Sequence, residues 1–331
     1  MPTAFVTGVT GFVGRHLVEV LREDGWTIIA GVRDTARAAR LLDNLLGNDI
    51  NLVEADLLKP ASLEAAVPEG ADCVFHVAAD VSSWSRDSER QYKTNVEGTA
   101  ALLQATLDRG VKRMVHVSSI VVYGEHESVI SDNTHRLGAE SWVGYVHSKS
   151  YAERKVKEAI DRGLDAVVVN PTDIVGKYDD QNWIRMIKMV ADGSLPAVPP
   201  GNGNFANGRA VAEGILAAYK HGKTGENYIL GGPYATFHEF LSLAASKLGK
   251  PTPKKPISPG VLKFYASVLE LISKLTGKRP AVTKEEAYFA CQSYRVNYDR
   301  AINDLGYRDV PLEQSVDEAI AYLRDKGELT P

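Results

Sequence analysis

The first strand-like segment of the chain runs into a glycine-rich turn and then into a helical pattern. Residues 4–6 are apolar, Gly8, Gly11 and Gly14 follow at three-residue spacing, and the helical pattern covers residues 12–22. The first glycine of such a turn permits a tight bend, the second lets the backbone approach a pyrophosphate, and the third lets the helix pack near the strand. The N-terminus of that helix offers N–H donors and a positive dipole end to phosphates. We predict a dinucleotide cradle made of Gly8, Thr10, Gly11, Phe12, Val13 and Gly14.

The first half of the chain alternates between apolar, β-rich runs and helical patterns. The alternation predicts βαβ units, and the continuously apolar strands predict a parallel sheet with helices on both faces. The fold class is therefore α/β, a Rossmann-type doubly wound parallel sheet. The runs lie at residues 4–6, 27–32, 51–53, 73–77, 113–117 and 166–169, and helical patterns lie at 12–22, 37–46, 88–109 and 145–162.

The alternation stops near Gly176. Residues 196–204 have the composition of a loop, residues 227–230 are strand-like, and the rest of the chain is mostly helical. We predict a dinucleotide-binding Rossmann domain over residues 1–175 and a smaller, mostly helical substrate-binding part over residues 176–331, interleaved with the sheet domain.

One late segment, residues 261–275, is strongly apolar at helical spacing. Lys263, Glu270 and Lys274 interrupt it, which favours a helix covering a core over a membrane anchor. The residues expected to face that core are Leu262, Tyr265, Leu269 and Ile272.

Composition and charge argue against several classes of protein. The 331 residues are 44% hydrophobic and 24% charged, which is ordinary for a globular protein, and a net charge of −4 gives no basic footprint for nucleic acid. Cys73 and Cys291 form neither a disulfide framework nor a metal cluster, and the histidines lack ligand spacing, so we predict no metal site. The sequence has no signal-peptide pattern and no run of about 18 apolar residues. We expect a cytoplasmic protein without a membrane span that binds a small molecule.

The end of the second apolar run bears on the choice between the two nicotinamide cofactors. NAD enzymes carry a carboxylate there for the adenosine ribose, whereas this chain has Val32, Arg33 and Asp34. Arg33 can hold a 2′-phosphate by charge-assisted hydrogen bonds, with Arg37 one turn further as a second ligand. Asp34 fits the N-cap of a helix starting at Thr35; the alternative makes Arg33 a solvated surface charge. We predict NADP, with NADPH favoured over NADH.

Tyr145 and Lys149 are four residues apart and share one face of the predicted helix over residues 145–162. A nearby ammonium favours the phenolate, so we expect Lys149 to lower the pKa of Tyr145 from about 10 toward neutral. The fifth apolar run ends at Ser118 and Ser119, at the carboxyl edge where open α/β sheets bind ligands. One serine can hydrogen-bond a carbonyl oxygen that Tyr145 protonates, and the other is expected to bond backbone.

In this combination the sequence resembles the extended short-chain dehydrogenase/reductase family. Residues 31–34 and 296–307 resemble the branch of dihydroflavonol reductases, cinnamoyl-CoA reductases and 3β-hydroxysteroid dehydrogenases, and sugar-nucleotide epimerases share the later segment. The chain departs from the family at residues 207–210, Asn-Gly-Arg-Ala, where members carry an acidic pair near the substrate lid. The matching residues, in the family's order, are Thr7-Gly8, Gly11, Gly14, Asp56-Leu57, Ala78-Ala79, Asn95, Ser118-Ser119, Val122-Tyr123-Gly124, Tyr145, Lys149 and Asn170-Pro171-Thr172.

The resemblance implies a role for each matched residue. Tyr145 would be the catalytic acid/base, Lys149 would lower its pKa and bond the nicotinamide ribose, and Ser119 rather than Ser118 would be the catalytic serine. For Asn95 it implies a water relay or a helix kink, and an interhelix hydrogen bond is the alternative. It also implies a homodimer through the helices at 88–109 and 145–162. The further implied cofactor contacts are Asp56 and Leu57 at adenine, Val77, Ala78 and Ala79 beside ribose and pyrophosphate, and Pro171, Thr172 and Ile174 at the nicotinamide.

We therefore expect an NADPH-dependent reductase of an aldehyde or ketone. Hydride would pass from nicotinamide C4 to the carbonyl carbon, while Tyr145 protonates the oxygen and Ser119 steadies it. One alternative is an NAD-dependent sugar-nucleotide epimerase or dehydratase, which an acid at position 32 or 33 would have favoured. Another is a non-catalytic NADP-binding redox sensor, which would tend to lose Tyr145 or Lys149. Candidate pocket aromatics are Trp84, Tyr123, His126, Trp142, His147, Tyr178 and Trp183.

Overall fold

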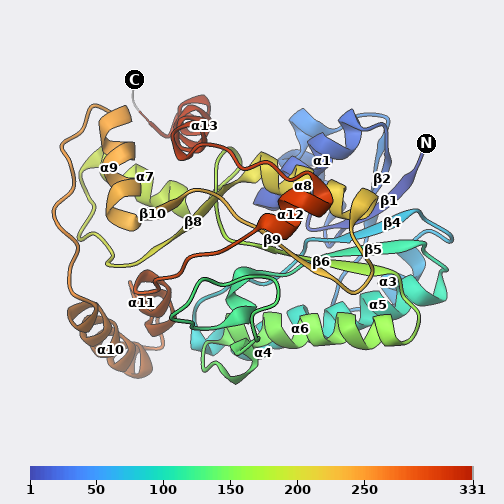
Figure 1. The fold of residues 1–331 in the computed structure, drawn as a ribbon, viewed down its shortest axis with the longest axis horizontal. Helices are drawn as coiled ribbons and strands as arrows, with labels where there is room; N and C mark the ends of the chain where they lie inside the picture. The colour runs from blue at the N-terminus through green and yellow to red at the C-terminus, as the bar shows by residue number, and fades with distance from the viewer. Residues whose placement is uncertain (330–331) are drawn as a thin grey trace.

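A seven-stranded parallel sheet forms the centre of the molecule (Figure 1). The structure is a computed structural model that describes residues 1–329. The strand order is β3-β2-β1-β4-β5-β6-β9, which is the doubly wound order of a Rossmann fold with one strand added at the β6 edge, so the predicted fold class is confirmed. The strands are β1 (Thr3–Thr7), β2 (Thr27–Val32), β3 (Ile50–Glu54), β4 (Cys73–His76), β5 (Arg113–Val117), β6 (Ala166–Pro171) and β9 (Asn227–Leu230).

Helices cover both faces of the sheet, and alternate residues of each strand pack against one layer or the other. In β1, Val6 faces the layer of α1 (Phe12–Glu23), α2 (Thr35–Leu41), α8 (Gly208–His221) and α12 (Asp299–Leu305). Phe5 faces the layer of α3 (Pro60–Ala66), α5 (Gly98–Asp108) and α6 (Gly144–Asp161). Figure 1 shows α1, α8 and α12 above the strands and α3, α5 and α6 below them. Because all the strand pairs of this sheet are parallel, the carboxyl ends of the strands lie at one edge.

A second, smaller unit lies beyond that edge. The strands β7 (Asp173–Val175), β8 (Asn202–Asn207) and β10 (Tyr234–Thr236) form a three-stranded sheet. Three helices pack on it: α7 (Trp183–Asp192), α9 (Phe237–Lys247) and α13 (Leu312–Asp325). The prediction of a loop over residues 196–204 is wrong for residues 202–204, because they pair antiparallel with Tyr234–Thr236.

The chain passes between the two units more than once. After β7 it forms α7 and β8 in the small unit, then returns to the large sheet as α8 and β9. The turn back occurs at Asn207, whose side chain caps α8 by accepting from the N–H groups of Arg209 and Ala210. Its amide nitrogen donates to Glu318 of α13 at 2.7 Å. The sequence departure at residues 207–210 is thus a helix cap that ties the two units together.

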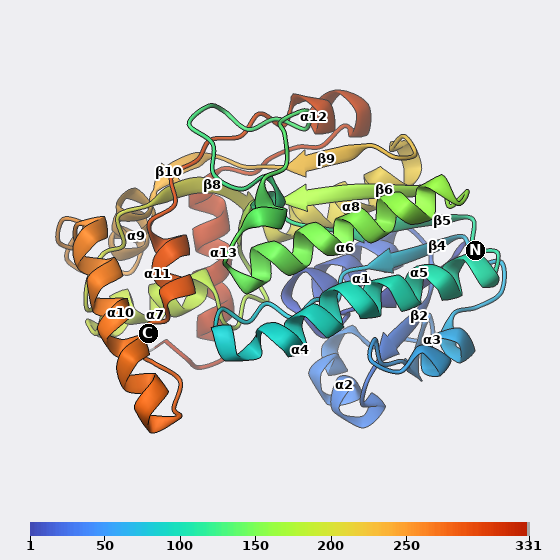
Figure 2. The ribbon, with the colours of Figure 1, turned by 90° about the horizontal axis from the view of Figure 1, so that it is seen from below.

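The helix predicted at residues 261–275 is α10 (Pro259–Thr276), which packs on α11 (Lys284–Ala290) at the periphery of the small unit (Figure 2). Leu262 is buried and Leu269 is half-buried, in agreement with a core-facing seam. The expectation is wrong for Tyr265 and Ile272, which are 50% and 48% exposed, because the seam is completed by the small residues Ala266 and Ser273 instead. Within residues 1–329, no helix combines the length and apolar character needed to cross a bilayer.

Candidate active site

The glycine turn between β1 and α1 leaves room that side chains would fill. Gly8 has φ +79°, and a Cβ on it would lie 2.6 Å from the Ala78 nitrogen. A Cβ on Gly14 would lie 1.9 Å from the Gly8 carbonyl oxygen, so α1 can approach the turn only with glycine there. Gly11 is the N-cap of α1, with no side-chain cap on the first N–H groups. These donors point to where a pyrophosphate is held in such turns, so the cradle fits a dinucleotide.

The segment after β4 lines the cradle. Residues 77–79 are half-buried, and the Ala78 N–H lies 3.3 Å from the Thr7 hydroxyl oxygen. Thr7 also contacts the Nδ1 atom of His76 at 2.8 Å, and the other ring nitrogen of His76 contacts Thr99 at 2.9 Å. His76 is therefore held between β1 and α5 as a satisfied buried residue, which fixes the path of the segment after it.

The adenosine end of the predicted site lies at the carboxyl ends of β2 and β3. Asp34 caps α2 by accepting from the Arg37 N–H at 2.8 Å, as predicted. Arg33 and Arg37 are exposed, and within residues 1–329 neither guanidinium takes part in an ion pair. Asp56 uses one carboxylate oxygen to accept from the Leu58 N–H at 3.0 Å, and Leu57 packs close to Gly98 of α5. Two unpaired cations at this edge fit a phosphate better than they fit bare ribose hydroxyls.

Tyr145 stands in the first turn of α6, with Ser119 opposite it. Ser119 follows β5 and caps the short helical turn at Ile120–Tyr123. Burial raises the pKa of Tyr145 above its usual value of 10, and the neighbouring Ser119 side chain opposes that shift. The phenol is thus protonated at neutral pH and lies close to a second hydroxyl, as a proton donor for an oxygen atom between them requires.

The expected net lowering of the Tyr145 pKa is wrong for the protein chain alone, because burial raises that pKa. Lys149 is 3% exposed, and its ammonium donates to the Val117 carbonyl at 2.8 Å. Burial lowers the pKa of Lys149 from 10.5 to about 8, and the carboxylate of Glu153 opposes that shift. Lys149 thus lies at the carboxyl end of β5 with a largely desolvated ammonium.

Ser118 points into the protein rather than into the cleft. Its hydroxyl donates to Glu153 at 2.8 Å, and the same carboxylate accepts from Asn170 and Asn227 and pairs with Arg136. The expectation that the second serine bonds backbone is therefore wrong, because a buried carboxylate on α6 needs donors and Ser118 supplies one. Glu153 escaped prediction although it continues the four-residue spacing of Tyr145 and Lys149.

Asn95 interrupts the helix predicted at residues 88–109. The structure has α4 (Ser88–Tyr92), a π-helical segment at Lys93–Glu97, and then α5. The Asn95 side chain accepts from the Asp80 N–H at 2.7 Å and donates to the Asp80 carbonyl and to Ser148 of α6. Both the kink and the interhelix hydrogen bond are thus present, and they hold the segment after β4 against α6.

Several further residues near the start of α6 and after β6 were not predicted from the sequence. The Phe289 ring of α11 meets the Tyr145 ring edge-on at 6.4 Å between centroids, and Glu285 accepts from the Gly144 N–H at 3.3 Å. Asp173, directly after Thr172, accepts from the Tyr294 hydroxyl at 2.6 Å, and burial raises its pKa to about 6. Neither α11 nor Tyr294 carries a motif, so only the fold reveals them.

The aromatic side chains predicted to line a pocket do not lie around one common pocket. Trp183 packs among Phe205, Phe237 and Phe240 in the small unit, and Trp142 is 61% exposed. The ring centroid of His147 lies 4.5 Å from that of Tyr151, on an outer side of α6. Of the remaining candidates, Tyr123 is fully buried beneath the Arg136 guanidinium, His126 bonds backbone carbonyls, Trp84 stacks with Arg86, and Tyr178 packs between His16 and Tyr322.

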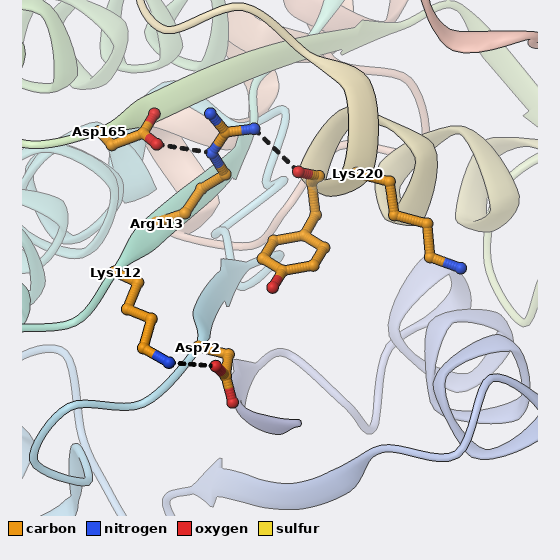
Figure 3. A pocket seen from close by; sticks show the side chains of 6 residues that line it. Asp72, Lys112, Arg113, Asp165 and Lys220 are labelled. Atoms are coloured by element: carbon orange, nitrogen blue, oxygen red, sulfur yellow. Dashed lines mark hydrogen bonds and ion pairs between the residues drawn. The ribbon is translucent and has the colours of Figure 1, made fainter. Parts of the chain in front are cut away.

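A polar hollow lies at the wrong edge of the sheet for this chemistry. Figure 3 shows Lys112 paired with Asp72 at 2.7 Å and Arg113 paired with Asp165 at 2.8 Å. These residues flank the amino ends of β4, β5 and β6, away from the cradle. Their charges are mutually satisfied, so the hollow offers no free group for catalysis. Within the described part of the chain, no three His, Cys, Asp or Glu side chains are grouped to hold a metal ion.

Comparison with known proteins places this site in a family. Residues 4–231 match the model of the NAD dependent epimerase/dehydratase family. The chain belongs to that family. The extended short-chain dehydrogenase/reductase assignment is thereby confirmed, and an NAD(P)-dependent oxidoreductase is the enzyme class.

Relatives in this family match over nearly the whole chain. A putative dihydroflavonol 4-reductase of Synechocystis is 30% identical over 98% of this chain and 95% of its own. Cinnamoyl-CoA reductase 1 of Arabidopsis thaliana is 27% identical over 99% of this chain and 91% of its own. The crystal structure of gox2253 superposes with a TM-score of 0.86 at 31% identity, covering all of both chains. A UDP-glucuronic acid 4-epimerase of Bacillus cereus in complex with NAD shares the fold, with a TM-score of 0.76 at 19% identity over 98% and 96% of the two chains.

Proposed function

We propose that this protein is an NADPH-dependent reductase that converts an aldehyde or ketone to an alcohol. The observation that carries the proposal is the placement of the Ser119 and Tyr145 side chains next to each other at the carboxyl edge of the sheet, on the same edge as the glycine cradle. The named relatives that align over nearly the full chain include a putative dihydroflavonol reductase and a cinnamoyl-CoA reductase. They support reduction of a carbonyl group as the reaction.

The bound cofactor would supply the hydride, and the chain's own residues would handle the oxygen. The carbonyl oxygen accepts hydrogen bonds from Tyr145 and Ser119, which orients the carbonyl carbon and stabilises the negative charge that develops on the oxygen. Tyr145 is protonated at neutral pH because burial raises its pKa, and its phenol gives that proton to the oxygen as the alcohol forms. Lys149 would hold the nicotinamide ribose of the bound cofactor, and Phe289 excludes water beside the Tyr145 ring.

We propose NADP as the cofactor because of Arg33 and Arg37. Both guanidinium groups are exposed at the carboxyl end of β2, and neither is neutralised by an acid within residues 1–329. A 2′-phosphate placed there gains charge-assisted hydrogen bonds that the hydroxyl of NAD cannot match. The proposed contacts of the remaining cofactor are the glycine cradle, Asp56 and Leu57, residues 77–79, and Pro171, Thr172 and Ile174.

A single assay separates the proposal from its alternatives. Purified protein is mixed with NADPH or NADH and a panel of aldehydes and ketones, and the loss of reduced-cofactor absorbance is followed, with Tyr145→Phe as the control. We expect carbonyl-dependent oxidation of NADPH that the control lacks. Conversion of a UDP-sugar by NAD-loaded protein would instead support the epimerase, to which solved structures at 19% identity offer likeness of fold alone. NADPH binding without turnover of any carbonyl would support the redox sensor.

We also propose a homodimer through α4, α5 and α6, which lie side by side in Figure 2. Tyr92 of α4 and His147 and Tyr151 of α6 form a half-buried aromatic cluster there, with the Arg154 guanidinium 4.9 Å from the Tyr151 ring centroid. Aromatic residues and arginine are enriched at protein interfaces. Light scattering of the wild type and of a Tyr92→Asp/Tyr151→Asp variant tests it, since a dimer held by this cluster becomes monomeric in the variant. The division at residue 175 and the cytoplasmic location stay predictions.

A further inference from the structure

Helix α10 carries an apolar surface that the rest of the protein leaves uncovered. Half of the large hydrophobic residues that are exposed within residues 1–329 lie on this one helix. Phe264 is 72% exposed and Leu275 is 83% exposed, so neither side chain lies against a neighbouring element. The uncovered set is Val261, Phe264, Tyr265, Val268, Leu271, Ile272 and Leu275, and we call it the α10 stripe.

The α10 stripe is continuous and faces away from the protein. At about 100° per residue its seven members fall within an arc of about 120°, which is the width of a helix face rather than a scatter. The side that packs on α11 is a different arc, made of Leu262, Ala266 and Ser273. Figures 1 and 2 show α10 at an outer corner in both views, with no other element beyond it. The fold therefore uses one side of α10 and presents the other to the surroundings.

The charge around the α10 stripe is mostly positive. Residues 250–279 contain six lysines and one arginine but only one acid, Glu270, in a chain whose net charge is −4. Arg279 pairs with Glu286 and Glu270 accepts from Ser85, but none of the six lysines forms an ion pair in the described part of the chain. On the same projection Lys263 and Lys274 lie about 60–80° outside the stripe, on the broader of the two sides that separate it from the α11 seam. The six lysines are Lys250, Lys254, Lys255, Lys263, Lys274 and Lys278.

We propose that the α10 stripe docks on an anionic lipid bilayer surface, with α10 lying in the plane of the interface. An apolar arc bordered by lysines is the pattern of helices that lie in that interface, where acyl chains take the apolar side chains and anionic headgroups take the ammonium groups. A second copy of this chain is a worse occupant, because a twofold contact through the stripe would set the two lysine clusters against each other. The absence of a spanning helix from residues 1–329 is compatible with docking, which requires one helix face only.

Docking by this face would hold the cleft near the bilayer. α10 is joined to the segment after β4, since Arg86 donates to the Gly277 carbonyl at 3.0 Å and Thr283 donates to the Ser83 carbonyl at 2.6 Å. α10 also packs on α11, which carries Phe289 against Tyr145. The stripe and the candidate active site are thus linked through α11 and through the segment after β4.

Flotation of the full-length protein with lipid vesicles tests the proposal without reference to activity. We expect binding to phosphatidylcholine vesicles that contain phosphatidylglycerol, weaker binding to phosphatidylcholine alone, and weakening by salt. A Phe264→Ser/Leu271→Ser/Leu275→Ser variant should lose at least about tenfold in partition, because the apolar contact is removed. A Lys254→Gln/Lys263→Gln/Lys274→Gln variant should lose about fivefold per lysine on anionic vesicles only.

A matched control removes exposed apolar residues elsewhere. Leu41→Ser/Ile302→Ser changes two side chains that are 46% and 42% exposed, and its vesicle binding should equal that of the wild type. All the changed residues are exposed, so unchanged thermal unfolding is expected and verifies folding. The proposal is overturned if the wild type does not float with anionic vesicles, or if the stripe and control variants bind alike. It is also overturned if the stripe triple variant turns a wild-type dimer into a monomer while vesicle binding persists.

Discussion

Replacing Lys149 by methionine should stabilise the fold at neutral pH while it abolishes turnover. Burial lowers the pKa of this lysine from 10.5 to about 8, and each pKa unit corresponds to about 1.4 kcal/mol. Keeping the ammonium charged in the folded protein at pH 7 therefore costs about 3 kcal/mol. Methionine fills the same space without charge, so this cost disappears. The loss of the hydrogen bond to the Val117 carbonyl cancels about 1 kcal/mol of the resulting stabilisation. The expected net increase in the free energy of unfolding is about 2 kcal/mol.

The gain should depend on pH in a definite direction. Because the folded pKa is lower than the unfolded one, the unfolded chain holds a proton between about pH 8 and 10.5 that the folded protein has released. The wild type is thus penalised fully below pH 8, and the penalty fades as the pH rises through that window. The advantage of Lys149→Met should be constant below pH 8 and shrink toward pH 10.5.

Urea unfolding at a series of pH values measures this difference, with Lys155→Met as the matched control. Lys155 lies on the same helix, but its side chain is 38% exposed and paired with Glu158 at the surface. Its replacement should change the free energy of unfolding by less than about 0.5 kcal/mol at any pH. A Lys149→Met protein that is less stable than the wild type at pH 7, or whose advantage does not vary above pH 8, would refute the reasoning.

Four further substitutions test the site. Tyr145→Phe should lower kcat by roughly 10²–10⁴-fold and leave the Kd of NADPH unchanged, as measured by steady-state kinetics and fluorescence titration, because only the proton donor is lost. Ser119→Ala should lower kcat by a smaller factor in the same assay, since water can replace one hydrogen bond. Ser118→Ala should lower kcat less than Ser119→Ala does and lose about 1–2 kcal/mol of unfolding free energy by urea titration, because the buried Glu153 carboxylate loses a donor. Arg33→Asp should weaken the binding of NADPH by about 2–4 kcal/mol, as calculated from Kd, and should not weaken the binding of NADH. Equal use of both cofactors by the wild type would contradict this.

The large sheet could be predicted because each of its strands carries its own apolar signal, whereas the small sheet could not. The sequence predicts a strand at residues 227–230, and β9 has the same bounds in the structure. β8 begins Asn-Gly-Asn, which has low β propensity, and its strand geometry comes from pairing with β10 some thirty residues later. No local pattern encodes such a pairing, so the asparagines and the glycine at residues 202–204 indicate a loop when the sequence is considered alone.

The site shows the same division between local and tertiary causes. The cradle could be predicted from sequence because a Cβ at Gly8 or Gly14 would collide with neighbouring backbone, so the spacing itself is the constraint. The pKa of Tyr145 could not, because the four-residue spacing to Lys149 says nothing of where the ammonium points. The structure turns it toward the Val117 carbonyl at the sheet edge. Phe289 could not be predicted either, because its contact with Tyr145 depends on how α11 is attached to the N-terminus of α6 through Glu285.

The choice between the two serines follows from the length of α6. Tyr145 and Glu153 lie eight residues apart, about 12 Å along a helix, so one serine cannot serve both. Ser118 is buried and bonded to Glu153, which fixes the end of β5 against the deep part of α6. Its neighbour Ser119, one residue further toward the sheet edge, then lies beside Tyr145 in the first turn of the helix. The buried pair therefore sets the position of the pair in the cleft, and loss of the Glu153 carboxylate should disturb the alignment of Ser119 without touching the substrate.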